Sequence, residues 1–192
     1  SIALHAVKRA RVEPGDVAAI IGPGAQGLLA GQAALLLGAA RVIMVGRGAR
    51  LETASAMGFE VVNNSETDGP EAVRALTDGL GASFTVDTAA RGTTPADAVA
   101  MTRKGGRVSL IGIPAEPVVL PLQRIVFEEM DLMGVRANPG TCEEVIPLIA
   151  EGKMDVDTVT THRFPLANFA EGYETFTKRI DGAIKVLIQP KQ

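Results

Sequence analysis

The stretch from Asp16 to Arg47 reads DVAAIIGPGAQGLLAGQAALLLGAARVIMVGR. An apolar run at 17–21 meets the glycine-rich turn GPGAQG at 22–27, a helix-compatible segment covers 25–37, and a second apolar run covers 42–45. The order strand, glycine turn, helix and strand within about thirty residues is typical of the unit that binds a dinucleotide. We therefore predict such a unit at the start of a parallel sheet.

Each glycine of the turn has a physical task in this interpretation. Gly22 allows the tight turn from strand to helix, Gly24 lets the backbone approach a pyrophosphate, and Gly27 lets the helix lie close to the strand. The helix begins at Ala25 and Gln26 with free N–H groups, which together with the helix dipole form an anion site. The competing interpretation is a glycine turn that only permits close packing.

The end of the second apolar run predicts which dinucleotide binds. NAD-binding versions carry an Asp or Glu there, which holds the ribose hydroxyls of the adenosine. In this chain Gly46, Arg47 and Gly48 follow Val45, and Arg50 lies one helical turn further on. A glycine leaves space for a 2′-phosphate and an arginine can pair with it, so we predict NADP over NAD. The alternative is that Arg47 stacks on the adenine or lies in solvent.

The composition is that of an ordinary soluble globular protein and excludes several other classes. The chain has 192 residues, 46% of them hydrophobic and 21% charged, with a net charge of −3. Nothing in this balance indicates nucleic acid or a membrane as a partner, and no signal-peptide pattern opens the chain. One cysteine and two histidines cannot form a conventional zinc site or a disulfide, which favours a cytoplasmic protein and no metal site in this chain.

Apolar periodicity predicts alternating strands and helices along the first two thirds of the chain. This pattern indicates an α/β fold, a doubly wound parallel (Rossmann) sheet covered on both faces. We place the dinucleotide-binding domain, with its leading helix, at 1–137 and a C-terminal tail segment at 138–192. Strands are predicted at 17–21, 42–45, 59–62, 83–87, 107–111, 131–135 and 183–188, with an extended piece at 158–164; helices are predicted at 1–11, 25–37, 50–57, 70–77, 95–102, 123–128, 143–151 and 166–178.

These residues resemble the cofactor-binding portion of the medium-chain, zinc-dependent alcohol and polyol dehydrogenases. The resemblance covers nearly the whole chain and rests on four segments: EPGD at 13–16 leading into IIGPGAQG, LGAARV at 37–42, KGGRV at 104–108, and DGAIKV at 181–186. It implies that Lys185 reaches the cofactor phosphates. It also implies that two loops border the adenosine and nicotinamide: Thr88, Ala89 and Arg91 in one, and Gly112 and Ile113 in the other.

The resemblance also implies what lies outside this sequence. Family members are nearly twice as long, with an N-terminal catalytic domain that supplies the zinc ligands, the proton relay and much of the substrate pocket. We therefore expect no catalytic residue here and an inactive isolated chain, with a tail that packs on the missing domain. In the whole enzyme, zinc polarises an alcohol or carbonyl substrate while hydride passes to or from the nicotinamide. The segment at 131–135 resembles the family's edge strand, which predicts a homodimer.

Two other functions stay open at this point. One is a zinc-free quinone or enoyl reductase of the same superfamily, although GPGAQG looks more like the zinc-using branch. The other is a non-catalytic module that only senses a dinucleotide, which predicts binding without turnover even in the native full-length protein.

Overall fold

The computed structural model describes residues 1–190, and its centre is a six-stranded sheet in which all neighbouring strands run parallel. The strand order is β3-β2-β1-β4-β5-β6, so the direction of winding reverses between β1 and β4. This confirms the predicted doubly wound sheet. The strands are β1 (Val17–Ile21), β2 (Arg41–Gly46), β3 (Glu60–Asn63), β4 (Ala82–Asp87), β5 (Thr102–Leu110) and β6 (Asp131–Gly134).

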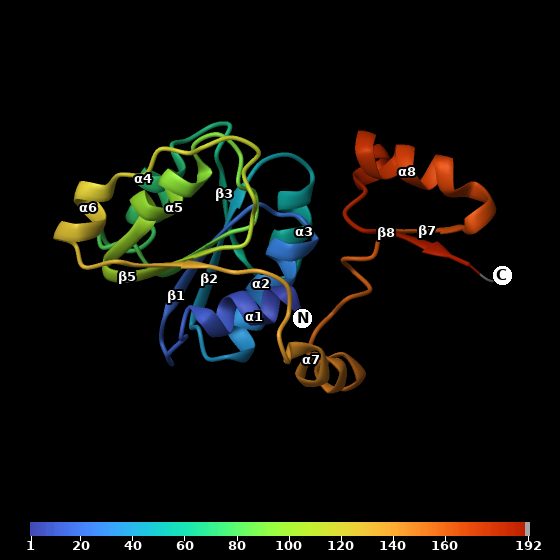
Figure 1. The fold of residues 1–192 in the computed structure, drawn as a ribbon, viewed down its shortest axis with the longest axis horizontal. Coiled ribbons are helices and arrows are strands. Elements are labelled where there is room, and N and C mark those ends of the chain that lie inside the picture. The colour runs from blue at the N-terminus through green and yellow to red at the C-terminus, as the bar shows by residue number, and fades with distance from the viewer. Residues whose placement is uncertain (191–192) are drawn as a thin grey trace.

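Eight α-helices and two short 3₁₀-helices accompany the strands in the described part of the chain (Figure 1). The α-helices are α1 (Ile2–Arg9), α2 (Ala25–Leu36), α3 (Arg50–Ala56), α4 (Gly69–Ala75), α5 (Thr94–Met101), α6 (Leu122–Phe127), α7 (Thr141–Ala150) and α8 (Phe169–Lys178). The 3₁₀-helices are Leu166–Asn168 and Ile180–Gly182.

The sheet is covered by helices on both faces because its strand residues alternate between two cores. In β1, Ala18 and Ile20 pack with α1, α2 and α3, whereas Ala19 and Ile21 pack with α4 and α5. The central strand β4 is buried along its whole length. Because β1, β2 and β4 run parallel, their carboxyl ends lie at the same edge of the sheet, where the predicted site lies.

Hydrophobicity in the sequence predicts that the leucines at 28, 29 and 35–37 cover the sheet, and the structure corrects this expectation. Leu28 is buried as expected, but Leu35, Leu36 and Leu37 are 43%, 39% and 37% exposed. Small residues make the buried contacts instead, and they are Gly27, Ala30, Gly31, Ala33 and Ala34. Small side chains let the helix axis come close to the strands, which leaves the leucines at the carboxyl end of the helix outside.

The strand predicted at 107–111 begins earlier in the structure, because the residues before it, which the sequence suggests as a turn at 104–106, form a bulge within β5. Ala82 pairs with Thr102 but Phe84 pairs with Arg107, so four residues of β5 stand opposite one residue of β4. Gly105 takes a φ of +64°, and its N–H donates to the carbonyl of Glu128. The chain therefore continues in strand direction through a local irregularity.

In the segment after residue 137, α7 packs against α1, whereas β7 (His162–Pro165), α8 and β8 (Val186–Gln189) form a smaller unit beside the sheet domain (Figure 1). The two strands of this unit pair in parallel, and α8 connects them. The observed β8 starts three residues later than predicted, and Leu166–Asn168 is a 3₁₀-helix before α8. The sheet domain holds this segment through Lys8 and Glu144, 2.7 Å apart, and through two hydrogen bonds between Gln32 and the backbone of Asp155.

Candidate functional site

The glycine turn joins β1 to α2 in the way that the sequence predicts. Gly22 has a φ of +101°, and a Cβ on Gly27 would lie 1.9 Å from the carbonyl oxygen of Gly22. Gly24 differs, since its φ is −90° and a Cβ there would meet only a guanidinium nitrogen of Arg50, 3.7 Å away. Gly22 and Gly27 are therefore explained by backbone geometry and packing, and Gly24 is not. At Gly24 the missing side chain leaves open space.

The N-terminus of α2 is open to a ligand. No side chain caps this helix and its first turn holds no acidic residue. By contrast, the Asp68 carboxylate caps α4 by accepting from the N–H of Glu71 at 2.9 Å. The amide oxygen of Gln26 is buried and has no hydrogen-bond partner among residues 1–190. Free N–H groups and an unfilled space at Gly24 together fit the pyrophosphate of a dinucleotide. The Gln26 oxygen is an acceptor, so it would need a donor and not a phosphate oxygen as its partner.

Arg50 lies beside this turn. Its guanidinium is the group nearest to Gly24, and it donates to the carbonyl of Ala183. Burial, and then the nearby charge of Arg179, lower the pKa of the Arg50 guanidinium. A bound anion would relieve both effects, so Arg50 is a candidate ligand of the pyrophosphate. The sequence had assigned it to the 2′-phosphate, and Arg179 was not foreseen.

The loop after β4 is tied to the glycine turn. The Thr88 hydroxyl donates to the carbonyl of Ile21 at 2.8 Å, and a Cβ on Gly22 would lie 3.5 Å from that of Ala89. The buried carboxylate of Asp87 accepts from the N–H groups of Ala89 and Ala90, at 2.9 and 3.1 Å. Asp87 thus sets the shape of this loop, a role that the sequence gave no means of detecting.

The loop after β5 packs against the same place. A Cβ on Gly112 would lie 2.4 Å from that of Ala90, and the N–H of Gly112 donates to the carbonyl of Asp87. The next residue, Ile113, is 80% exposed. The structure therefore brings the loops at 88–91 and 112–113 together beside the glycine turn. That these loops border the cofactor stays a prediction.

Three cations predicted to bind cofactor are exposed. The side chains of Arg47, Arg91 and Lys185 make no hydrogen bond or ion pair within the described chain. Lys185 follows Ala183 by two residues. Since Arg50 lies beside Gly24 and donates to the carbonyl of Ala183, the segment that carries Lys185 lies near the glycine turn. Gly46 ends β2 and is buried. These positions leave the three cations available to an anion.

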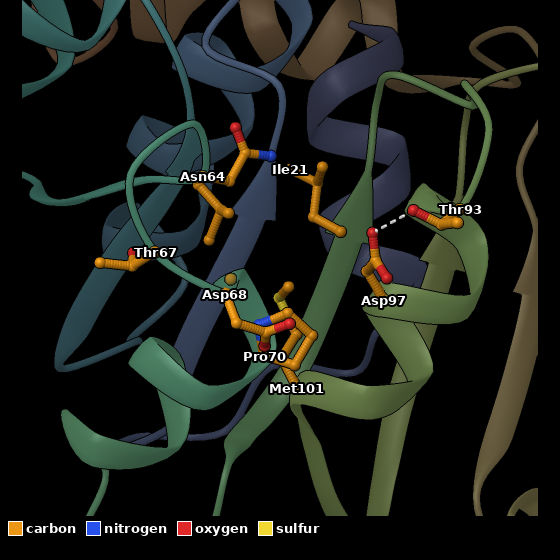
Figure 2. Close-up of a pocket in the computed structure, with 10 residues that line it drawn as sticks. Ile21, Asn64, Thr67, Asp68, Pro70, Thr93, Asp97 and Met101 are labelled. Carbon is orange, nitrogen blue, oxygen red and sulfur yellow. Dashed lines mark hydrogen bonds between the residues drawn. The ribbon is translucent and has the colours of Figure 1, made fainter.

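A cavity of about 230 Å³ adjoins the ends of β1 and β2 (Figure 2). Ile21 and Val45 form part of its wall, and polar groups come from the β3–α4 loop and the start of α5. Asp97 accepts from the Thr93 hydroxyl at 2.8 Å (Figure 2). Sequence reasoning missed the polar members of this cavity because their elements are far apart in the chain: Asn64, Thr67, Asp68, Thr93 and Asp97.

No metal centre accompanies this site within residues 1–190. These residues contain no group of three or more His, Cys, Asp or Glu side chains placed to hold a metal ion. They also contain no helix long and apolar enough to cross a membrane. Because no such group of ligands is present among residues 1–190, these side chains do not fit a zinc ion, and no chemical step is assigned to one.

The open helix N-terminus at the edge of a doubly wound sheet defines a dinucleotide-binding domain. The sequence profile described as zinc-binding dehydrogenase matches residues 25–151. The chain belongs to the zinc-binding dehydrogenase family, as its resemblance indicated.

Relatives and solved structures agree with this membership. Sorbitol dehydrogenase of Bacillus subtilis is 28% identical over 195 residues, which cover 100% of this chain and 55% of that protein. Alcohol dehydrogenase TADH from Thermus sp. ATN1 has a TM-score of 0.91 at 29% identity, covering 98% of this chain and 55% of that one. A zinc-binding dehydrogenase from Sinorhizobium meliloti bound to NADP has a TM-score of 0.91 at 27% identity, covering 98% and 56%. The chain thus spans about half the length of the proteins it matches.

Proposed function

We propose that this chain binds NADP in preference to NAD and forms the cofactor-binding half of a zinc-dependent alcohol or polyol dehydrogenase. The carrying observation is the uncapped N-terminus of α2 at Gly24, with Gly46 standing where NAD-binding versions have a carboxylate. The relatives named above, a sorbitol dehydrogenase among them, support an alcohol or polyol substrate.

In this proposal, different residues of the site bind different parts of the cofactor. The N–H groups at the start of α2 and the guanidinium of Arg50 hold the pyrophosphate, with Lys185 adding positive charge. The adenosine ribose lies beside Gly46, which carries no carboxylate, and Arg47 pairs with its 2′-phosphate. The cavity beside Val45 adjoins that ribose and is where we place the adenine.

The chain's part in catalysis is binding and orientation. Bound NADP supplies the hydride acceptor, or NADPH the donor. Thr88 and Asp87 fix the loop that borders the nicotinamide end, and Gly112 lets the second loop lie against it. The whole protein's substrate-binding and proton-transferring groups are expected in the other half, where the family resemblance also places zinc.

Calorimetric titration of the chain with NADP and with NAD, at one fixed salt concentration, tests the cofactor. We expect NADP to bind at least about tenfold more tightly, since one charge-assisted hydrogen bond contributes about 1.5–3 kcal/mol. The variant Arg47→Asp should reverse the preference. The control Arg9→Asp makes the same charge change at an exposed position of α1 and should leave it unchanged.

The outcomes of this titration separate the parts of the proposal. Equal affinities would contradict the NADP preference and leave dinucleotide binding intact. Binding of neither cofactor would contradict cofactor binding by this chain. An unchanged preference in Arg47→Asp would show that Arg47 does not contact the 2′-phosphate.

We also propose that two copies pair through the free edge of β6. This strand has β5 as its one neighbour in the sheet, and the preceding helix exposes Leu122, Val126 and Phe127. An unpaired strand edge beside an apolar surface favours association. Light scattering after size exclusion should give a dimer that Val126→Glu dissociates, whereas Leu80→Glu, at an exposed apolar position elsewhere, should not. A monomer at high concentration contradicts the pairing.

The proposed compartment is the cytoplasm. The single cysteine of the sequence supports it, because secreted proteins commonly carry disulfides.

A further inference from the structure

The ring of Pro23 packs directly on Gly46. Pro23 is the second residue of the glycine turn, Gly46 is the last residue of β2, and both are buried. A Cβ built on Gly46 would lie 2.2 Å from Cδ and 2.6 Å from Cγ of Pro23. Real Cβ atoms essentially never come within 3.0 Å of a heavy atom of a non-neighbouring residue. Gly46 does not have a positive φ, so its glycine is required by this contact and not by backbone conformation.

Two atoms of the proline ring cause this exclusion. The next atom that a Cβ on Gly46 would meet is the backbone nitrogen of Pro23, at 3.5 Å, which is ordinary van der Waals contact. Replacing Pro23 with alanine removes Cγ and Cδ and keeps the nitrogen. The backbone at position 46 would then accept a Cβ at ordinary van der Waals distance.

Position 46 is where a dinucleotide-binding domain selects its cofactor. A carboxylate at the end of this strand binds the ribose hydroxyls of NAD and repels the 2′-phosphate of NADP. Building on the proposed NADP preference, we infer that Pro23 is a specificity-determining residue. Its ring excludes a carboxylate side chain from position 46, so no negative charge stands there to repel the 2′-phosphate. The selection therefore resides in the Pro23–Gly46 pair, beyond the charge of Arg47.

A cycle of four proteins tests this inference by calorimetry with NAD and NADP. Gly46→Asp alone should bind NAD no better than the wild type, because the ring prevents the aspartate from taking its place. Pro23→Ala/Gly46→Asp should bind NAD at least about tenfold more tightly than Gly46→Asp does, and should lose the NADP preference. Pro23→Ala alone should keep the NADP preference, since position 46 is still glycine.

A second cycle measures the contact without any cofactor. Gly46→Ala should lower the melting temperature, and Pro23→Ala/Gly46→Ala should recover most of that loss relative to Pro23→Ala. The control is Gly134→Ala, a strand glycine where a Cβ would meet nothing within 4 Å. It should leave the melting temperature nearly unchanged.

Three results would overturn the inference, and they are distinguishable. If Gly46→Asp alone gains NAD affinity as strongly as the double variant, the ring does not control the position. If Pro23→Ala brings no recovery to Gly46→Ala, the contact itself is absent. If the wild type shows no NADP preference, the proposed function fails and the specificity role fails with it, while the melting experiment still reports on the contact.

Discussion

The two ends of the sheet treat charge in opposite ways. At the amino end, Asp16 is 5% exposed and accepts from Arg107 at 2.6 Å, and Arg41 pairs with Glu60 at 2.7 Å. At the carboxyl end, Arg47 and Arg91 are exposed and their side chains have no partner among residues 1–190. The arginines at the amino end are therefore paired within the protein, whereas Arg47 and Arg91 at the carboxyl end have no such partner among residues 1–190.

This difference shows which charges bear on stability and which on binding. A buried carboxylate such as Asp16 requires its cation, because an unpaired buried charge is strongly unfavourable. A solvated arginine such as Arg47 costs little to keep and holds its full attraction for a phosphate. The three predictions below test that division, from the largest expected effect to the smallest.

Arg107→Ala should lower the free energy of unfolding by about 3–5 kcal/mol, because it leaves the Asp16 carboxylate buried without its main partner. Urea denaturation measures this loss. Arg103→Ala is the matched control, since Arg103 is 46% exposed and lies 3.8 Å from Asp16; it should cost less than about 1 kcal/mol. Equal losses of unfolding free energy in the two variants would show that the buried pair of Asp16 and Arg107 stabilises the protein no more than the exposed contact with Arg103 does.

Gly27→Ala and Gly24→Ala should separate packing from binding within one turn. Gly27→Ala forces a methyl group against the carbonyl of Gly22, and we expect a loss of about 1–3 kcal/mol in the free energy of unfolding. Gly24→Ala meets open space and should stay within about 1 kcal/mol of the wild type. It should nevertheless weaken NADP and NAD alike, by at least about tenfold, in a calorimetric titration. Undiminished affinity in Gly24→Ala would remove the pyrophosphate from this turn.

The pair of Arg41 and Glu60 should give the smallest effect, because both side chains are more than a third exposed. The hydrogen bond from Arg41 holds the pKa of the Glu60 carboxyl below its usual value. A lowered folded-state pKa stabilises the protein above the unfolded-state pKa, and this is lost as the pH falls through the lowered value.

Glu60→Gln should therefore cost about 0.2–1 kcal/mol at neutral pH and nothing at a pH below the lowered pKa. Urea denaturation at the two pH values measures the difference. Glu116→Gln, at an exposed carboxylate between β5 and α6, should show no such pH dependence. A cost for Glu60→Gln that persists in acid would have to come from packing.

Local patterns in the sequence were enough to predict the sheet and the glycine turn. The run at 17–21, the turn at 22–27 and the helix after it depend on neighbours in the chain, and the structure has them within one residue. The exposed Leu35, Leu36 and Leu37 were misplaced because hydrophobicity does not show that a helix face of alanine and glycine packs closest. The bulge at 103–106 was missed because its cause is the register of β5 against β4.

The sequence predicted those residues of the site that belong to a local motif, and it missed the contacts between residues that are far apart in the chain. Gly24 and Gly46 could be read from motifs, whereas the contact of Pro23 with Gly46 requires knowing how the turn lies over β2. Asp87 has no motif, since its role is to accept from the N–H groups of Ala89 and Ala90. The bond from Arg50 to the carbonyl of Ala183 has no motif either, because the two residues are 133 positions apart in the sequence.

In the proposed complex, the bond from Arg50 to the carbonyl of Ala183 links cofactor binding thermodynamically to the last part of the chain. The guanidinium proposed as a pyrophosphate ligand is held by a segment beyond α8, so cofactor binding changes the free energy with which that segment docks. A cofactor that binds the docked arrangement more tightly stabilises it by a free energy that rises with the logarithm of cofactor concentration. We therefore expect protection of residues near 183 from amide exchange to rise with cofactor, although Arg50 lies 133 residues earlier in the sequence.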